Sequence, residues 1–448
     1  MKTIQKSIWS VLVVVLWVSG EASAISEKPY EVAWIRQLGT NGDDKSGGAS
    51  ADGTGNVYIS GITSGSLGGP NAGGWDAFVS KYDTSGNLLW TRQLGTNRDD
   101  LSFGVSADNL GSVFISGVTQ GSLGGTNAGG LDAFVSKYDA LGNLLWTHQI
   151  GTRQWDESFG VSTDGLGNVF ISGKTEGSLG GLNAGGYDAF VSKYDAVGNL
   201  LWTRQIGTKW DDESYGVSAD GLGNVFISGM TRGSLGGPYA GDVDAFVSNF
   251  DTLGNLLWTR QLGTSDWDTS DGVSADGMGN VYISGWTDGS LGGPNAGKSD
   301  AFVSKYDEAG NLLWTRQLGT DSSEETFGIS ADCMSNVFIS GVTWGPLGGP
   351  NAGDADVFVG KFDRMGNLLW THQIGTNDTD YGNGVSVDIL GNVYISGWTL
   401  GPLGGPNAGG ADAFVVKLVP EPATISLLGL GFAGIAGMRR RRQARPLL

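Results

Sequence analysis

The chain has few of the residues that build common catalytic centres. Its 448 residues include one cysteine, Cys333, and two histidines, His148 and His372. A single cysteine excludes an intrachain disulfide and any zinc or redox site built on several cysteines. Both histidines occupy a position of an internal repeat that holds arginine in five other units, so neither indicates a Ser-His-Asp or Cys-His centre. The sequence therefore predicts no catalytic residue.

Basic residues and helix-forming stretches are also scarce. The chain carries 27 Lys and Arg against 46 Asp and Glu, a net charge of −19, which repels nucleic acid and anionic surfaces. We therefore expect no nucleic-acid partner. Glycine is abundant, with 78 residues, but it follows no G-X-Y period and is accompanied by 16 Trp and 17 Phe. This composition predicts an all-β protein in which tight turns join short buried strands.

A repeat fills the middle of the chain. A tryptophan recurs every 56 residues, at positions 34, 90, 146, 202, 258, 314 and 370. Within one unit, residues 104–108, 113–117, 133–138 and 144–150 are predicted strands, and Asp-x-x-Gly-Asn-type turns join the first to the second and the third to the fourth. Four antiparallel strands in a fixed repeat are typical of a propeller blade.

The number of strands predicts a closed ring. The first three strands occur seven times, but the fourth follows a third strand only six times and stands once alone, at residues 32–38. The sequence therefore predicts a seven-bladed β-propeller over residues 25–419, in which the N-terminal strand completes the last blade and removes its open edges. The segments Gly-Asn-Val-Tyr-Ile-Ser-Gly (55–61) and Asp-Ala-Phe-Val-Ser-Lys-Tyr-Asp (76–83) resemble the bacterial seven-bladed β-propeller (SBBP) repeat family. That resemblance implies the fold and little about activity.

Both ends of the chain resemble processing segments. Residues 1–24 are typical of a signal peptide, with an apolar stretch at 8–18 and small residues, Ala22 and Ala24, at the cleavage site. Residues 420–448 form a sorting tail with an apolar stretch at 423–438, expected to form a short transmembrane helix. Its motif residues are Pro420, Glu421, Pro422, Arg439, Arg440, Arg441 and Arg442. The tail resembles the PEP-CTERM sorting signal, which implies processing by an exosortase. The alternatives are an uncleaved N-terminal anchor and a simple tail anchor.

One face of the predicted propeller is acidic and aromatic. The connections from fourth to first strands and from second to third strands emerge on the same face, because strand directions alternate. Carboxylates there suit Ca²⁺, and tryptophans suit sugars, whereas the alternative is a solvated rim whose tryptophans pack the loops. No other cofactor is expected. The candidate metal ligands are Asp43, Asp44, Asp99, Asp100, Asp211 and Asp212. The candidate ligand face comprises Trp155, Trp210, Trp267, Trp286 and Trp398.

A separate aspartate begins every third strand. Such an aspartate commonly caps a loop by accepting backbone hydrogen bonds, although a ring of seven carboxylates also suits cations. The residues are Asp76, Asp132, Asp188, Asp244, Asp300, Asp356 and Asp412.

These features predict a non-enzymatic exported protein of the envelope or extracellular matrix that presents a rigid propeller surface. The expected location is the cell surface or the medium, after a transient stay in the membrane through the C-terminal tail. Expected partners are the exosortase and exopolysaccharide or other envelope components. Two alternatives remain open: a carbohydrate- or calcium-dependent, lectin-like module, and a polysaccharide lyase or glycosidase. A glycosidase would need two inward carboxylates about 5–9 Å apart.

Overall fold

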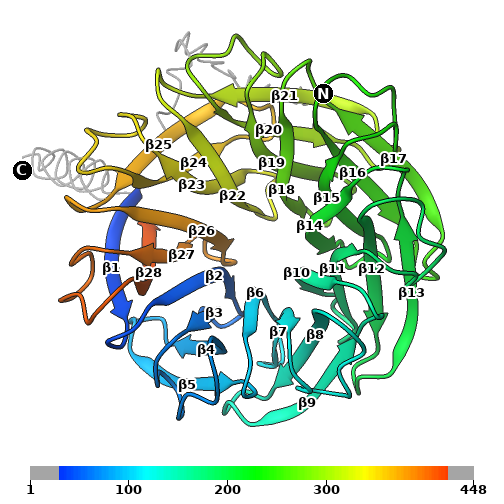
Figure 1. The fold of residues 1–448 in the computed structure, drawn as a ribbon. Helices are drawn as coiled ribbons and strands as arrows, with labels where there is room; N and C mark the ends of the chain where they lie inside the picture. The colour runs from blue at the N-terminus through cyan, green and yellow to red at the C-terminus, as the bar shows by residue number, and fades with distance from the viewer. Residues whose placement is uncertain (1–29, 422–448) are drawn as a thin grey trace, which may run out of the picture.

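The computed structural model describes residues 30–421, which form seven four-stranded antiparallel sheets around one axis (Figure 1). The sheets are numbered here as blades 1 to 7 in chain order, and blade 7 combines both ends of the described chain. This arrangement confirms the predicted seven-bladed propeller. The predicted signal peptide, its cleavage site, the apolar stretch at 423–438 and the arginine cluster lie outside the described residues. Within residues 30–421, no helix is long and apolar enough to cross a membrane.

In the strands nearest the axis, most of the repeated positions carry small residues such as Ser, Gly and Ala. Each of these strands contains a β-bulge at its fourth residue, where two residues oppose one on the neighbouring strand. These inner strands are β2 (Asp44–Ala51), β6 (Asp100–Ala107), β10 (Asp156–Thr163), β14 (Asp212–Ala219), β18 (Asp268–Ala275), β22 (Glu324–Ala331) and β26 (Asp380–Val387). They begin four residues earlier than predicted, because the bulge interrupts the alternation that marks a strand in the sequence.

The second strand of each blade is rich in β-branched and aromatic residues and is buried on both faces. These strands are β3 (Val57–Thr63), β7 (Val113–Thr119), β11 (Val169–Thr175), β15 (Val225–Thr231), β19 (Val281–Thr287), β23 (Val337–Thr343) and β27 (Val393–Thr399). The third strands are equally buried: β4 (Asp76–Tyr82), β8 (Asp132–Tyr138), β12 (Asp188–Tyr194), β16 (Asp244–Phe250), β20 (Asp300–Tyr306), β24 (Asp356–Phe362) and β28 (Asp412–Pro420).

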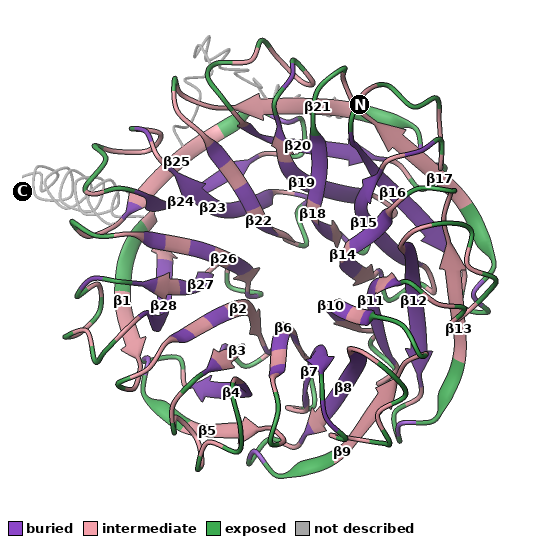
Figure 2. Cartoon of the chain, in the orientation of Figure 1, coloured by how far each residue is buried: buried purple, intermediate pink, exposed green. Residues whose placement is uncertain are grey.

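The outer strands form the rim, and their exposed stretches are green in Figure 2. They are β5 (Leu88–Leu94), β9 (Leu144–Ile150), β13 (Leu200–Ile206), β17 (Leu256–Leu262), β21 (Leu312–Leu318), β25 (Leu368–Ile374) and β1 (Tyr30–Leu38). Six of them begin with an exposed leucine, whereas β1 begins with Tyr30. The core consists of seven layers, one between each pair of neighbouring blades. In one such layer, Phe114 and Val135 of blade 2 pack with Val169, Ile171 and Phe190 of blade 3. The chain therefore buries apolar surface between neighbouring sheets. Such burial is required in a repeat protein, because each repeat contacts only its neighbours.

The N-terminal strand closes the ring, as predicted. β1 pairs antiparallel with β28 in the sheet order β1-β28-β27-β26. The pairing extends beyond the predicted residues 32–38 and begins with Tyr30 opposite Pro420. Pro420, the first proline of the sorting motif, is therefore the last residue of a blade strand.

The short hairpin turns gather on one face, called here the turn face. In the turn after β4, Asp83 accepts hydrogen bonds from the backbone N–H groups of Ser85 and Asn87, at 2.9 and 2.8 Å. Gly86 adopts a φ of 80°, which favours glycine. The opposite face carries the connections from fourth to first strands and from second to third strands, and it is called here the loop face.

Candidate functional site

The acidic pairs predicted as metal ligands lie at the loop face, but the two members of each pair have different surroundings. Asp44, Asp100 and Asp212 are not loop residues: they begin inner strands and are fully buried. Asp100 accepts hydrogen bonds from the backbone N–H and hydroxyl of Thr96, at 2.5 and 2.8 Å, and from the hydroxyl of Thr119 at 2.5 Å. Burial raises the pKa values of all three carboxyls, despite these hydrogen bonds.

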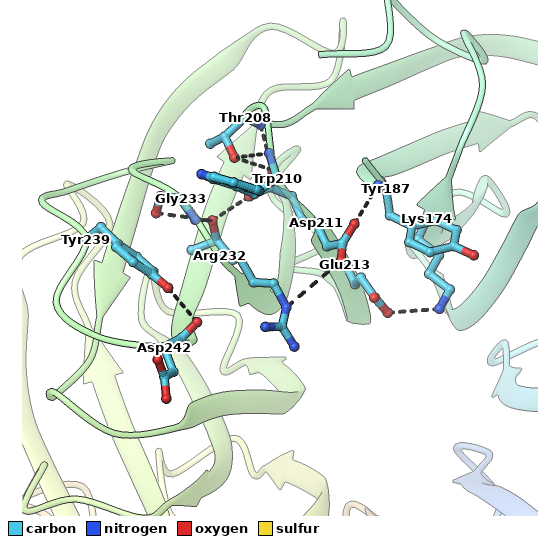
Figure 3. Close-up of polar contacts among 12 residues, drawn as sticks. Lys174, Tyr187, Thr208, Trp210, Asp211, Glu213, Arg232, Gly233, Tyr239 and Asp242 are labelled. Carbon is cyan, nitrogen blue, oxygen red and sulfur yellow. Dashed lines mark hydrogen bonds and ion pairs between the residues drawn. The ribbon is translucent and has the colours of Figure 1, made fainter. Parts of the chain in front are cut away.

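The first members, Asp43, Asp99 and Asp211, are half-buried and join loops of neighbouring blades. Asp99 accepts a hydrogen bond from the backbone N–H of Trp75 at 3.0 Å, and Asp43 accepts one from Ala411 at 2.9 Å. In Figure 3, Asp211 lies between the backbone N–H of Tyr187, at 3.1 Å, and the Arg232 guanidinium, at 3.9 Å. Both members of a pair thus hold the loop face together. Among residues 30–421, no cluster of three or more His, Cys, Asp or Glu side chains is suited to a metal ion.

The aspartates that begin the third strands cap the connections that precede them. Asp76 accepts hydrogen bonds at 2.8 Å from the backbone N–H of Ala72 and from the Gln93 amide. Blades 2 to 7 repeat this pair of contacts, with the same atoms at 2.6–2.8 Å. The recurrence of this aspartate therefore has a structural reason.

The predicted tryptophan face separates into exposed and packed side chains. Trp155 and Trp210 are 50% and 54% exposed, and Trp267 is 39% exposed. Trp286 and Trp398 are strand residues rather than the loop residues predicted, because β19 and β27 continue to a threonine beyond them. Their rings stack on neighbours: Trp286 on Trp267 with centroids 6.2 Å apart, and Trp398 on Tyr381 with centroids 4.6 Å apart.

One of the exposed tryptophans borders a groove. Trp155 lines a cavity of about 660 Å³ on the loop face, between the connections of blades 2 and 3. Its other lining residues are mostly polar or glycine: Thr96, Asn97, Arg98, Gln120, Gly121, Ser122, Asn127, Gly129, Gly130 and Leu131. An aromatic face beside amide, hydroxyl and guanidinium groups is able to stack on and hydrogen-bond a sugar ring.

A second group of residues surrounds the axis and was not predicted from the sequence. The bulge residue of each inner strand lines an axial pocket of about 320 Å³: Gly47, Phe103, Phe159, Tyr215, Asp271, Phe327 and Asn383. Below it, a narrower compartment of about 150 Å³ is lined by the glycine and the aliphatic residue that follow in each strand. The signal in the sequence is that this position varies, whereas the Gly that follows it and the Ser two residues further on recur in all seven units.

Comparison with known proteins agrees with this architecture. Residues 145–180, 201–236, 257–292 and 369–404 match the family described as "Beta-propeller repeat" (SBBP), and residues 418–442 match the PEP-CTERM protein-sorting motif. The chain is therefore a propeller protein built of SBBP repeats that carries a PEP-CTERM sorting motif. That motif indicates an exported protein, sorted to the cell surface and processed by an exosortase.

Two curated proteins are similar to the chain over part of their length. The regulatory protein FlaEY of Caulobacter vibrioides is 27% identical over 375 residues, which cover 72% of this chain and 38% of FlaEY. An uncharacterized WD repeat-containing protein of Acanthamoeba polyphaga mimivirus is 22% identical, with 72% of this chain and 31% of that protein covered. The chain thus spans about a third of the length of these curated relatives.

Among solved structures, a luciferin-regenerating enzyme is similar with a TM-score of 0.38 and 11% identity, covering 71% of this chain and 92% of that one. A polysaccharide lyase that acts on ulvan is similar with a TM-score of 0.47 and 12% identity, covering 81% and 93%.

Proposed function

We propose that this protein is a non-enzymatic interaction module, displayed at the cell surface, whose loop face binds its partner. One observation supports this proposal most: the side chains of the seven units differ from one another where the loop face meets the axis. The second residue of the inner strand is Lys45, Leu101, Glu157, Glu213, Thr269, Glu325 or Tyr381, whereas the flanking strand residues barely change. A constant scaffold that carries a variable surface is the arrangement expected of a repeat protein that recognises a specific partner.

The turn face has the opposite character, because its repeated side chains serve the scaffold. From the outer strand of blade 1, the Trp90 indole donates a hydrogen bond to the carbonyl oxygen of Ala140 in blade 2 at 3.2 Å, and Arg92 donates to that of Gly142 at 2.7 Å. These residues join one blade to the next turn, so their recurrence needs no ligand. The loop face is therefore the better candidate surface for a partner.

A carbohydrate is the second candidate, and the groove beside Trp155 favours it. The groove combines a half-exposed indole with the polar groups of Asn97, Arg98 and Gln120. A neutral or weakly acidic polysaccharide of the cell envelope suits these groups. Exopolysaccharide is thus the proposed ligand class, and we propose that the lectin-like role does not require calcium, since Asp99 and Asp100 are engaged by loop hydrogen bonds.

Glycan binding by the exported protein tests this candidate. We expect a glycan-array signal that Trp155→Ala removes and that Trp210→Ala keeps, because Trp210 is equally exposed but lies outside the groove. We also expect an unchanged melting temperature in EDTA. Loss of binding with both variants, or no glycan signal at all, contradicts the groove as a sugar site. Release of sugars from purified exopolysaccharide contradicts the non-enzymatic proposal itself.

A further inference from the structure

The axial pocket differs from the groove in position and in chemistry. All seven inner strands surround the axis (Figure 1), and each contributes its bulge residue to the pocket. A β-bulge turns a side chain out of the regular alternation of a strand, so the repeated bulge directs the fourth residue of every inner strand toward the axis. All seven blades contribute a residue to this pocket, and all but Gly47 present a side chain to it.

Four of the seven residues that line this pocket are aromatic, and one is charged. The ring centroids of Phe103 and Phe159 are 5.4 Å apart, and those of Phe159 and Tyr215 are 5.5 Å apart. Phe327 supplies a fourth aromatic group. Asp271 is the only charged residue among the seven bulge residues, and its neighbours on the adjoining inner strands are Tyr215 and Phe327.

Asp271 has an enclosed oxygen that nothing in the described chain satisfies. Its Oδ2 is buried and has no hydrogen-bond partner among residues 30–421. An ionised carboxylate in such a place is costly unless a counter-charge neutralises it. Burial, with a smaller effect from the Glu325 carboxylate, raises the pKa of Asp271 to about 8. A cation placed beside Asp271 would remove this cost.

The pocket is unsuited to other classes of ligand. Hard cations such as Ca²⁺ need six or more oxygen ligands, whereas the side chains that line the pocket offer one carboxylate, one amide oxygen and one phenol hydroxyl. Anions are disfavoured, because the carboxylates at this end of the axis, those of Glu157, Glu213, Asp271 and Glu325, outnumber the ammonium groups of Lys45 and Lys174. Sugars need many polar partners, which phenyl rings do not supply.

An ammonium group of the protein already uses the same kind of surface nearby. The Lys174 ammonium lies 5.7 Å from the ring centroid of Phe159 and 4.5 Å from that of Tyr187. It also forms an ion pair of 3.0 Å with Glu213, which Figure 3 shows. One aromatic residue of the pocket, Phe159, therefore already has a nitrogen cation beside it.

We propose that the axial pocket binds a methylated ammonium group, with Asp271 as counter-ion and Phe159, Tyr215 and Phe327 as aromatic walls. Aromatic faces attract cations through the ring quadrupole, and a methylated ammonium is weakly hydrated, so it loses little on leaving water. This site adds to the proposed loop-face function and does not depend on the groove beside Trp155.

Calorimetric titration with choline, compared with its uncharged isostere 3,3-dimethylbutan-1-ol, tests the proposal. We expect choline to bind and the alcohol of the same shape to bind about tenfold more weakly or not at all, because only the cation gains from the carboxylate and the rings. We expect Asp271→Asn, which keeps the size of the side chain, to weaken choline binding about tenfold. Equal binding of the two compounds, or unchanged choline binding by the variant, overturns the proposal.

Two further variants separate loss of the site from loss of the fold. Phe159→Leu keeps an apolar side chain but removes a ring, and it should weaken choline binding without changing the circular dichroism spectrum. Trp155→Ala lies outside the axial pocket and should bind choline as the unmodified protein does. Choline binding that persists in Phe159→Leu, or that disappears in Trp155→Ala, counts against the axial site. Failure of the sugar test leaves these outcomes unaffected.

Discussion

Arg36 donates a hydrogen bond from Nε to the carbonyl oxygen of Gly86, at 2.7 Å, and so joins the N-terminal strand to the first blade. The same contact recurs in other blades, as between Arg204 and Gly254 at 2.7 Å. Residues 39–43 link β1 covalently to blade 1, whereas β1 and β28 of blade 7 meet only after a full turn of the ring and are joined by strand pairing. β1 therefore serves two blades: it completes the sheet of blade 7 and contacts the turn of blade 1.

Deletion of residues 30–38 should destroy the closure. β28 would expose an unpaired edge, which favours association with other chains or unfolding. We expect the truncated protein to melt at a lower temperature, or to elute as an oligomer in size-exclusion chromatography with light scattering. A synthetic peptide of residues 30–38, added in excess, should restore part of the melting temperature. A truncated protein that stays monomeric and melts like the full chain contradicts this role of β1.

The glycine in the middle of each second strand should not tolerate alanine. A Cβ atom at Gly117 would lie 1.8 Å from the carbonyl oxygen of Leu101, because the bulge brings the inner strand unusually close. We expect Gly117→Ala to lower the free energy of unfolding by about 2–3 kcal/mol, measured by urea denaturation. Gly165→Ala is the matched control, because its Cβ would have no atom within 4 Å. Similar losses in both variants would show that crowding is not the cause.

Replacing His148 with arginine should stabilise the protein. His148 occupies the position of the arginine that reaches the next turn in other blades, but its Nε2 is enclosed and has no hydrogen-bond partner in the described chain. It is half-buried. We expect His148→Arg to form the missing bond to the carbonyl oxygen of Gly198 and to raise the free energy of unfolding by about 1 kcal/mol.

The same variant should change the response to acid. Burial lowers the pKa of His148, and of His372, below the usual value of 6.5. The unfolded chain therefore binds more protons, so the contribution of these residues to stability is complete above about pH 6.5 and is lost as the pH falls below it. Urea denaturation at pH 7 and pH 5 should show a smaller loss for His148→Arg. An equal loss in both proteins contradicts this assignment.

Ser335 should show two opposing effects. It is the only non-glycine residue of the described chain with a positive φ, 61°, in a turn position that glycine holds in the other six blades. Its hydroxyl donates a hydrogen bond to Asp276 at 2.6 Å. Ser335→Ala keeps the strained backbone and loses this bond, so we expect a loss of about 1–3 kcal/mol in the free energy of unfolding. Ser335→Gly loses the same bond but relieves the strain, so its stability should be nearly unchanged. If Ser335→Gly loses as much free energy of unfolding as Ser335→Ala, backbone strain does not offset the lost hydrogen bond.

Much of the architecture could be predicted because it depends on local chemistry that repeats. The fixed spacing of Trp34 and its equivalents, and the turns in which glycine takes a positive φ, define strands, hairpins and the number of blades. The lone strand at the N-terminus required a partner, and β28 offered the only matching open edge in the described ring. These inferences need only the periodicity of the chain and the cost of an unpaired strand.

The candidate sites were less predictable, because they depend on contacts between blades. Asp99 and Asp100 are adjacent and chemically alike in the sequence, yet one joins two loops and the other is buried under Thr96 and Thr119. The pleat of the strand sends neighbouring side chains to opposite faces, and only the packing of the next blade decides which face is buried. The six other acidic positions at the starts of inner strands follow the same logic.

The repeat alone specified the all-β fold, the seven blades and the closing strand, because each follows from local propensity and from the number of strands. Only the tertiary structure showed that the variable bulge residues of the inner strands surround a common axial pocket. Phe159 and Asp271 lie 112 residues apart in the chain, and nothing in either segment indicates a shared space. They line one pocket because a bulge in every inner strand turns its fourth residue inward and the closed ring brings seven such residues to one axis.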